Sequence, residues 1–128
     1  MEETNLSAIL IAEDEPKLRE IYTEELEDDG HIIITADNGK SALQILKKVE
    51  KIDLIIVDIK MPQMNGIELI EKIREINNNV PIIICSAYEG LKTDFTIVTS
   101  DIVEFLIKPV DINYLSKRVA EILVINKN

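Results

Sequence analysis

Side chains that could do chemistry stand directly after the apolar runs of this sequence. In chain order they are Glu13, Asp14 and Glu15 after the first run, Asp58 at the end of the third, Ser86 at the end of the fourth and Lys108 after the fifth. If these positions meet, the carboxylates repel one another and resist joint ionisation, unless a cation neutralises them or some of them stay protonated. Mg²⁺ (or Mn²⁺) fits, because such ions bind through carboxylates and no His or Cys cluster competes for a softer metal. An acidic pair holding a metal, a free carboxylate on Asp58, a Lys and a hydroxyl together suit phosphoryl transfer.

The elements that must bring these residues together are predicted by the alternation of short apolar runs with helical patterns. The predicted strands are Ala8–Ala12, Ile32–Ala36, Leu54–Asp58, Ile82–Ser86 and Glu104–Ile107. This alternation is typical of repeated βα units around a parallel sheet. Three of the runs are apolar without alternation, which indicates strands covered on both faces by helices.

The expected fold class is α/β: a flavodoxin-like, doubly wound sheet of five parallel strands in the order 2-1-3-4-5, with about five helices on both faces. In such a sheet, ligands bind beyond the carboxyl ends of the strands, at the point where the strand order reverses. The first and third strands are neighbours at that point. Glu13, Asp14 and Asp58 are therefore expected to share one crevice, and Lys108 is expected to face it.

Capping residues predict where the helices begin and end. Pro16 suits the first position of the first helix, and Gly30 can end that helix in a left-handed conformation. Asn38, Asn65 and Asp111 can cap the second, third and last helices. The predicted apolar stripes are Leu18, Ile21, Tyr22 and Leu26; Ala42, Leu46 and Val49; Ile70, Ile73 and Ile76; and Leu115, Val119 and Ile122. The fourth helix, expected over 91–100, is rich in β-branched residues, which predicts a short or mobile helix.

Length and charge exclude several classes of protein. A chain of 128 residues has the size of one domain, and its net charge of -10 would repel phosphate backbones and anionic lipid surfaces. No apolar run is long enough to span a bilayer and the N-terminus lacks a signal peptide, so a cytoplasmic protein is expected. The single Cys85 excludes a disulfide or a Cys-based metal site and is interpreted as a packed thiol. His31 is isolated, and we interpret it as structural rather than as a group that carries phosphate.

The residues above, with their spacing and order, resemble the receiver domain of two-component response regulators over nearly the whole chain. The motifs that carry the resemblance are Ile11–Glu15, Val57–Asp58, Met61–Pro62, Asn65–Gly66, Ser86–Ala87 and Phe105–Pro109. The resemblance implies one receiver domain over residues 1–128, without an output domain.

The resemblance also implies a role for each site residue. Asp58 would be the phosphoacceptor, and Glu13, Asp14, Asp58 and the backbone carbonyl of Lys60 would bind Mg²⁺. Lys108 would pair with the phosphoryl group and Ser86 would donate a hydrogen bond to it, while Phe105 would turn inward when Ser86 moves. A cis Lys108–Pro109 peptide would aim the ammonium into the pocket. Lys60 and Tyr88 would set the lifetime of the acyl phosphate, and their large size predicts slow hydrolysis.

The implied partners are a sensor histidine kinase or phosphotransfer protein and a downstream protein, bound through helix four, strand five and helix five. Neither nucleic acid binding nor membrane insertion is expected. The chain would be a monomer or a phosphorylation-dependent dimer. It would turn over no external substrate, because only its own phosphorylation and dephosphorylation are involved.

The sequence departs from the family before the last strand, where Ser100-Asp101-Ile102 replaces a small Ala-Gly-Ala turn. Asp tolerates the left-handed conformation better than most residues, so Asp101 can end the fourth helix at modest cost. This departure, with the β-branched stretch before it, leads to the hypothesis that the fourth helix is unusually mobile before phosphorylation.

Purely structural roles for the site residues, and other functions, stay open at this point. Taken alone, Asp58 could be a helix cap, Ser86 a satisfied hydroxyl, Phe105 a core residue and Lys108 a solvated strand end. A flavodoxin-like cofactor carrier shares the strand order, but three acids would oppose a flavin phosphate. A phosphatase with an aspartyl intermediate typically has a second Asp where Lys60 stands. A degenerate receiver that only binds partners is disfavoured by the intact set of site residues.

Overall fold

The five strands form one parallel sheet in the order β2-β1-β3-β4-β5, as the sequence predicted. The structure is a computed structural model that describes residues 6–87 and 101–127, with side chains described up to residue 124. Its strands are β1 (Ala8–Ala12), β2 (Ile32–Ala36), β3 (Leu54–Asp58), β4 (Ile82–Ser86) and β5 (Glu104–Ile107). All five predicted strand ranges are confirmed. Their residues are mostly β-branched or apolar, as is typical of strands.

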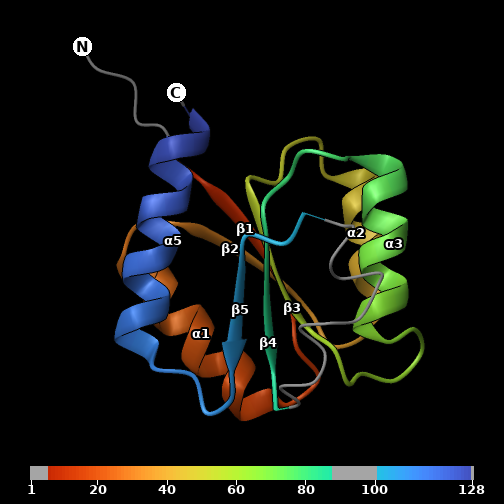
Figure 1. Cartoon of the computed structure of the whole chain (residues 1–128), viewed down its shortest axis with the longest axis horizontal. Helices are drawn as coiled ribbons and strands as arrows, with labels where there is room; N and C mark the ends of the chain where they lie inside the picture. The colour runs from red at the N-terminus through yellow and green to blue at the C-terminus, as the bar shows by residue number, and fades with distance from the viewer. Residues whose placement is uncertain (1–5, 88–100, 128) are drawn as a thin grey trace.

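Helices cover both faces of the sheet (Figure 1). The described residues contain α1 (Pro16–Asp28), α2 (Gly39–Lys48), α3 (Gly66–Ile76) and α5 (Ile112–Lys127). α1 and α5 lie on one face, and α2 and α3 lie on the other. The sequence predicted about five helices, and the structure describes four. The predicted fourth helix falls within 88–100, outside the described residues. No helix in the described part of the chain is both long and apolar enough to cross a membrane.

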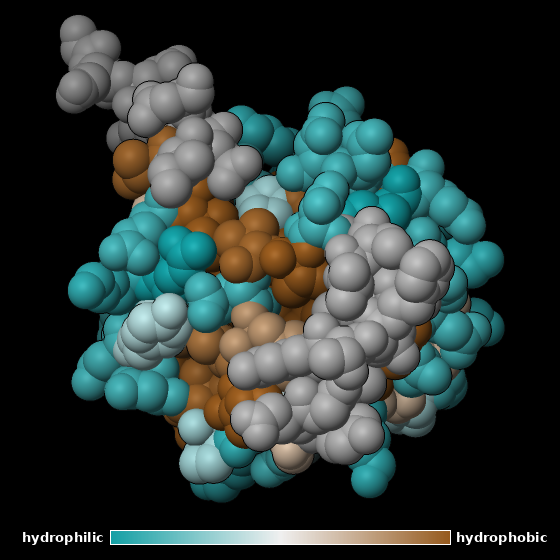
Figure 2. All heavy atoms as spheres, viewed as in Figure 1, coloured by the Kyte–Doolittle hydropathy of each residue, from teal (hydrophilic) through white to brown (hydrophobic). Residues whose placement is uncertain are grey.

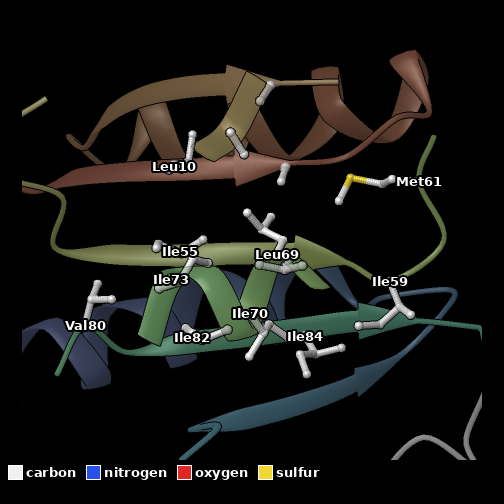
Figure 3. Close-up of a cluster of buried hydrophobic side chains, with 14 residues drawn as sticks. Leu10, Ile55, Ile59, Met61, Leu69, Ile70, Ile73, Val80, Ile82 and Ile84 are labelled. Carbon is white, nitrogen blue, oxygen red and sulfur yellow. The ribbon is translucent and has the colours of Figure 1, made fainter. Parts of the chain in front are cut away.

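Each face of the sheet has its own buried core. On the α2/α3 face, Leu69, Ile70 and Ile73 of α3 pack against Ile55 and Ile82 of the strands (Figure 3). On the α1/α5 face, the buried cluster is made of Ile9, Ile11, Tyr22, Leu26, Leu54, Ile56, Ile83, Cys85, Leu115, Val119, Ile122 and Leu123. Successive residues of a strand point to opposite faces, so the strands β1, β3 and β4 contribute alternately to the two cores. The continuous apolar runs of these three strands follow from this double coverage.

The predicted caps are confirmed. The side chains of Asn38 and Asn65 accept hydrogen bonds from the backbone N–H groups of Ser41 (2.8 Å) and Glu68 (3.0 Å). Asp111 caps α5 by accepting from two backbone N–H groups, those of Asn113 (2.9 Å) and Tyr114 (3.2 Å). These caps fix where α2, α3 and α5 begin relative to the carboxyl edge of the sheet.

Backbone conformations at two chain turns also agree with the sequence. Gly30 ends α1 at a φ of 99°, and Asp101 has a φ of 54°, in the left-handed region that was predicted for it. The carbonyl oxygen of Asp101 accepts a hydrogen bond of 3.3 Å from the Arg74 guanidinium, which ties the start of the β5 segment to α3.

Two predicted core residues lie at the surface instead. Ile21 and Ile76 are 44% and 47% exposed, although both were placed on buried stripes. Ile21 lies one residue before Tyr22, about 100° away around α1, and so falls at the margin of the buried stripe. Ile76 is the last residue of α3, beyond the part of the helix that covers the sheet.

Candidate functional site

Three carboxylates meet at the carboxyl edge of the sheet. Glu13, Asp14 and Asp58 each offer an oxygen, and these oxygens lie within 4.8 Å of one another. Glu13 is 1% and Asp58 5% exposed, whereas Asp14 is open to solvent. Two of the three, Asp14 and Asp58, line a pocket of about 740 Å³. Its other lining residues are Glu15, Ile59, Lys60, Asn65, Ile67, Ser86, Ala87 and Lys108. The crevice predicted from strand order is therefore present.

Lys108 places a positive charge between two of these acids. Its Nζ lies 3.2 Å from Oε1 of Glu13 and 3.4 Å from Oδ1 of Asp58. The backbone N–H of Lys108 donates to the Ser86 carbonyl at 2.8 Å, and the Lys108–Pro109 peptide is cis, as predicted. Burial would lower the pKa of Lys108, but the carboxylates of Glu13 and Asp58 prevail and raise it. The ammonium is thus held charged between the two buried acids.

The charge of the cluster remains unbalanced, because three carboxylates lie together and, within the described part of the chain, Lys108 is the cation in ion-pair contact with them. Burial, followed by the charge of Glu13, raises the pKa of Asp58 to about 7, although Lys108 opposes the shift. Oε1 of Glu13 is buried and has no hydrogen-bond partner among the described residues. Oxygen ligands, excess negative charge and an open coordination side at Asp14 fit a hard divalent cation, and no soft ligand takes part.

The loop between β3 and α3 fixes the position of Asp58 through backbone contacts. The backbone N–H of Lys60 donates to Oδ1 of Asp58 at 3.4 Å, and the N–H of Gly66 donates to the Ile59 carbonyl at 2.8 Å. A Cβ on Gly66 would lie 2.5 Å from the carbonyl oxygen of Asp58, so only glycine permits this approach. The sequence motif Asn65–Gly66 therefore has a steric cause.

A second glycine contact holds the same loop, and no feature of the sequence indicated it. Gln63 and Met64 have φ angles of 54° and 107°, which are rare for residues with side chains. A Cβ on Gly39, at the start of α2, would lie 2.2 Å from the carbonyl oxygen of Met64. The backbone of the loop at Met64 is thus in direct contact with the start of α2.

The structure places the other predicted residues as follows. Ser86 is buried and lines the pocket, and Phe105 packs against the core on the α2/α3 face. Strand alternation puts Ser86 on that same face, on the neighbouring strand. His31 precedes β2, at the edge of the sheet opposite the pocket. Tyr88 lies outside the described residues.

Two residues of α1 escaped the sequence analysis as site residues. The Arg19 guanidinium donates to the backbone carbonyl of Glu13 at 2.9 Å. Tyr22 was predicted only as a core residue, yet the charges of Glu13 and Asp58 act on its hydroxyl. Nothing in the local sequence distinguishes these two residues from ordinary members of an amphipathic helix.

Comparison with known proteins agrees with this geometry. The family model for the response regulator receiver domain matches residues 9–120. The chain belongs to this family. Receiver domains are signalling switches of two-component systems, and they interact with kinases or phosphotransfer proteins and with downstream effectors. This membership argues against the cofactor-carrier and phosphatase alternatives.

Curated relatives of this receiver domain differ in length. Sporulation initiation phosphotransferase F of Bacillus subtilis is 32% identical over 120 residues, which cover 94% of this chain and 96% of that protein. The transcriptional regulatory protein GlrR of Escherichia coli is 30% identical over 115 residues, or 90% of this chain but 26% of that protein. The chain thus spans about a quarter of the length of the first regulators that it matches.

Solved structures show the same receiver fold. The response regulator TrrA of Thermotoga maritima, in complex with Mg²⁺-BeF, is 32% identical, has a TM-score of 0.83 and covers 91% of this chain and 99% of its own. A CheY-like receiver domain protein of Methanospirillum hungatei is 25% identical, with a TM-score of 0.89 over 96% of this chain and 98% of its own.

Proposed function

We propose that this receiver domain is a phosphorylation-dependent switch in which Asp58 accepts the phosphoryl group of a phosphohistidine on a sensor histidine kinase or phosphotransfer protein. A carboxylate oxygen of Asp58 forms a bond to phosphorus as the P–N bond breaks, and the histidine nitrogen leaves with the electron pair. The observation that carries the proposal is the position of Asp58: its Oδ1 lies 3.4 Å from the Lys108 ammonium, and both residues line the pocket.

Each neighbour of Asp58 has a role in this proposal. Lys108 moves from Glu13 toward the phosphoryl oxygens, whose charge it neutralises, and the Ser86 hydroxyl donates a hydrogen bond to them. Glu13, Asp14, Asp58 and the backbone carbonyl of Lys60 hold Mg²⁺. The complex of the relative TrrA with Mg²⁺-BeF supports this choice of metal. When bound, Mg²⁺ supplies positive charge that offsets repulsion between the attacking carboxylate and the phosphoryl group.

The output surface in this proposal is the face of β5 and α5, together with the predicted fourth helix. Figure 2 shows hydrophobic residues gathered over the region where β5 and α5 lie in Figure 1. Exposed large residues there include Val103 and Val124, which are 38% and 61% exposed. Since Phe105 and Ser86 lie on one face of neighbouring strands, movement of Ser86 toward a phosphoryl group would alter this surface. A downstream protein, or a second copy of the domain, binds it in the cytoplasm.

The decisive test is phosphorylation by a small phosphodonor in Mg²⁺, followed by intact mass. The wild-type protein should gain one phosphate, and Asp58→Asn should gain none. Asp37→Asn is the matched control, because Asp37 also follows a strand but lies outside the pocket. It should be phosphorylated as the wild type is. An unmodified wild type, or an equal adduct on Asp58→Asn, contradicts the proposal.

A further inference from the structure

The Tyr22 hydroxyl is a buried polar group for which the structure gives no use. Tyr22 is 2% exposed, and its ring belongs to the core on the α1/α5 face. The hydroxyl oxygen has no hydrogen-bond partner among the described residues. The Cys85 thiol interacts with it, but sulfur is a weak acceptor and does not satisfy a buried hydroxyl. Burying such a hydroxyl is unfavourable, and Phe would fill the same space without this penalty.

Strand alternation places this hydroxyl beneath the acidic pocket. Cys85 lies in the same core as Tyr22 and is the register partner of Asp58 on the neighbouring strand. Val57 and Ala12 belong to the opposite core, so the next residues, Asp58 and Glu13, lie on the side of α1. Tyr22, Cys85 and the two buried carboxylates therefore occupy the same side of the sheet at its carboxyl edge.

The electrostatics agree with this placement. Burial first, and then the charges of Cys85, Glu13 and Asp58, raise the pKa of Tyr22 well above its ordinary value. The hydroxyl thus keeps its proton and is available as a hydrogen-bond donor beside two acids.

Glu13 offers a matching acceptor. Its Oε1 is buried without a hydrogen-bond partner among the described residues, although the Lys108 ammonium lies 3.2 Å away. The rest of Glu13 is already fixed: Oε2 accepts from the Glu15 N–H at 3.2 Å, and the backbone carbonyl accepts from Arg19 at 2.9 Å. Arg19 and Tyr22 lie one turn apart on α1. The helix that binds the main chain of Glu13 through Arg19 therefore also carries the Tyr22 hydroxyl, a donor without a partner among the described residues.

We propose that Tyr22 is a positioning residue for Glu13. When Lys108 gives way at Glu13 to a divalent cation, the Tyr22 hydroxyl donates a hydrogen bond to the Glu13 carboxylate and holds it in the orientation that binds that cation. A neutral donor suits this task because it orients a ligand carboxylate without adding a competing charge. This inference rests on the proposed function, since it assigns Glu13 to the metal site.

The test is Mg²⁺ binding to unphosphorylated Tyr22→Phe, which removes the hydroxyl and keeps the ring. Calorimetry should show binding about 10-fold weaker than in the wild type. The metal-free variant should unfold at the same temperature or a higher one, because it has lost an unsatisfied buried hydroxyl. The wild type should also show a tyrosine absorbance change on addition of Mg²⁺ that Tyr22→Phe lacks.

Tyr114→Phe is the matched control. It also loses a tyrosine hydroxyl, but one that donates to Glu104 at 3.4 Å on the exposed surface of α5. Its Mg²⁺ affinity and its absorbance change should equal those of the wild type. Wild-type Mg²⁺ affinity in Tyr22→Phe would overturn the role of Tyr22 and leave the proposed function intact. A wild-type protein that binds no Mg²⁺ would overturn both.

Discussion

The Lys108 ammonium lies 3.2 Å from Oε1 of Glu13, across the ends of the two strands that separate them. This ion pair joins the end of β1 to the end of β5 and passes beside Asp58. It is largely shielded from solvent, since the two side chains are 17% and 2% exposed. Much of the charge balance of the pocket in the metal-free protein therefore depends on Lys108.

Replacement of Lys108 by an uncharged residue should destabilise the metal-free protein. In Lys108→Met, Glu13 and Asp58 stay buried without the ammonium, and the free energy of unfolding at pH 8 should fall by about 1–3 kcal/mol. Chemical denaturation with a chelator present measures it. Lys51→Met is the control, because Lys51 is 77% exposed and lies 3.8 Å from Asp53. Its effect should stay within about 0.5 kcal/mol, and equal losses in the two variants would contradict this role of Lys108.

Stability should also depend on pH through Asp58. Its pKa is raised to about 7 in the folded protein, from an ordinary value of 3.8, so the folded state binds the proton more tightly than the unfolded state does. Its contribution is therefore fully present below about pH 4 and is lost as the pH rises through about 7. Without metal, Asp58 should lower the free energy of unfolding by at least about 1 kcal/mol between pH 5 and pH 8.

The comparison that isolates this effect is Asp58→Asn, which cannot ionise at that position. Denaturation of the two proteins at pH 5 and pH 8, with chelator, gives the difference attributable to Asp58. Asp58→Asn should lose less stability over this range than the wild type. Identical pH dependence in the two proteins would show that Asp58 titrates normally.

Much of the site could be predicted from the sequence, because its residues stand at strand ends. The apolar runs ending at Ala12 and Asp58 are continuous, so they could be interpreted as buried parallel strands, and the switch-point rule then brought Glu13 and Asp58 together. Lys60 was different. Its role came from the resemblance to receiver domains, since a backbone carbonyl leaves no trace in the local sequence.

What escaped prediction depends on contacts between distant segments. Gly39 permits the close approach of Met64, but a glycine after the cap Asn38 looks like any helix start. Tyr22 was placed correctly in the core. Its hydroxyl comes near Glu13 and Asp58 only because α1 packs against the sheet beneath the ends of β1 and β3, and the sequence does not show this packing. Ile21 shows what helical periodicity cannot predict. Whether a residue at the side of an apolar helix face is buried depends on how far the sheet extends beneath the helix.

Gly66 should matter for phosphorylation as well as for stability. A Cβ in Gly66→Ala would lie 2.5 Å from the Asp58 carbonyl oxygen and 2.7 Å from Cα of Ile59, so the backbone behind Asp58 must shift. The expected cost is about 1–3 kcal/mol of unfolding free energy, with a severalfold slower phosphorylation by a small phosphodonor. Denaturation and intact mass over time measure the two effects.

Gly30→Ala separates these two effects. Gly30 has a φ of 99°, but a Cβ there would meet no atom within 4 Å, so alanine at this position adds conformational strain alone. It should cost about 1–2 kcal/mol and leave the phosphorylation rate unchanged, because Gly30 lies at the end of α1 remote from the pocket. A phosphorylation rate in Gly66→Ala equal to that in Gly30→Ala would show that the contact behind Asp58 is irrelevant to the reaction.

The lifetime of the acyl phosphate should depend on Lys60. Lys60 lines the pocket and its side chain is exposed, so it can crowd the path of a water molecule to phosphorylated Asp58. Lys60→Asn shortens that side chain and should release phosphate severalfold faster than the wild type. Release is followed after the phosphodonor is removed, in Mg²⁺. Lys40→Asn makes the same substitution at an exposed position of α2 outside the pocket and should leave the rate unchanged. If both variants release phosphate at the wild-type rate, Lys60 does not restrict access of water.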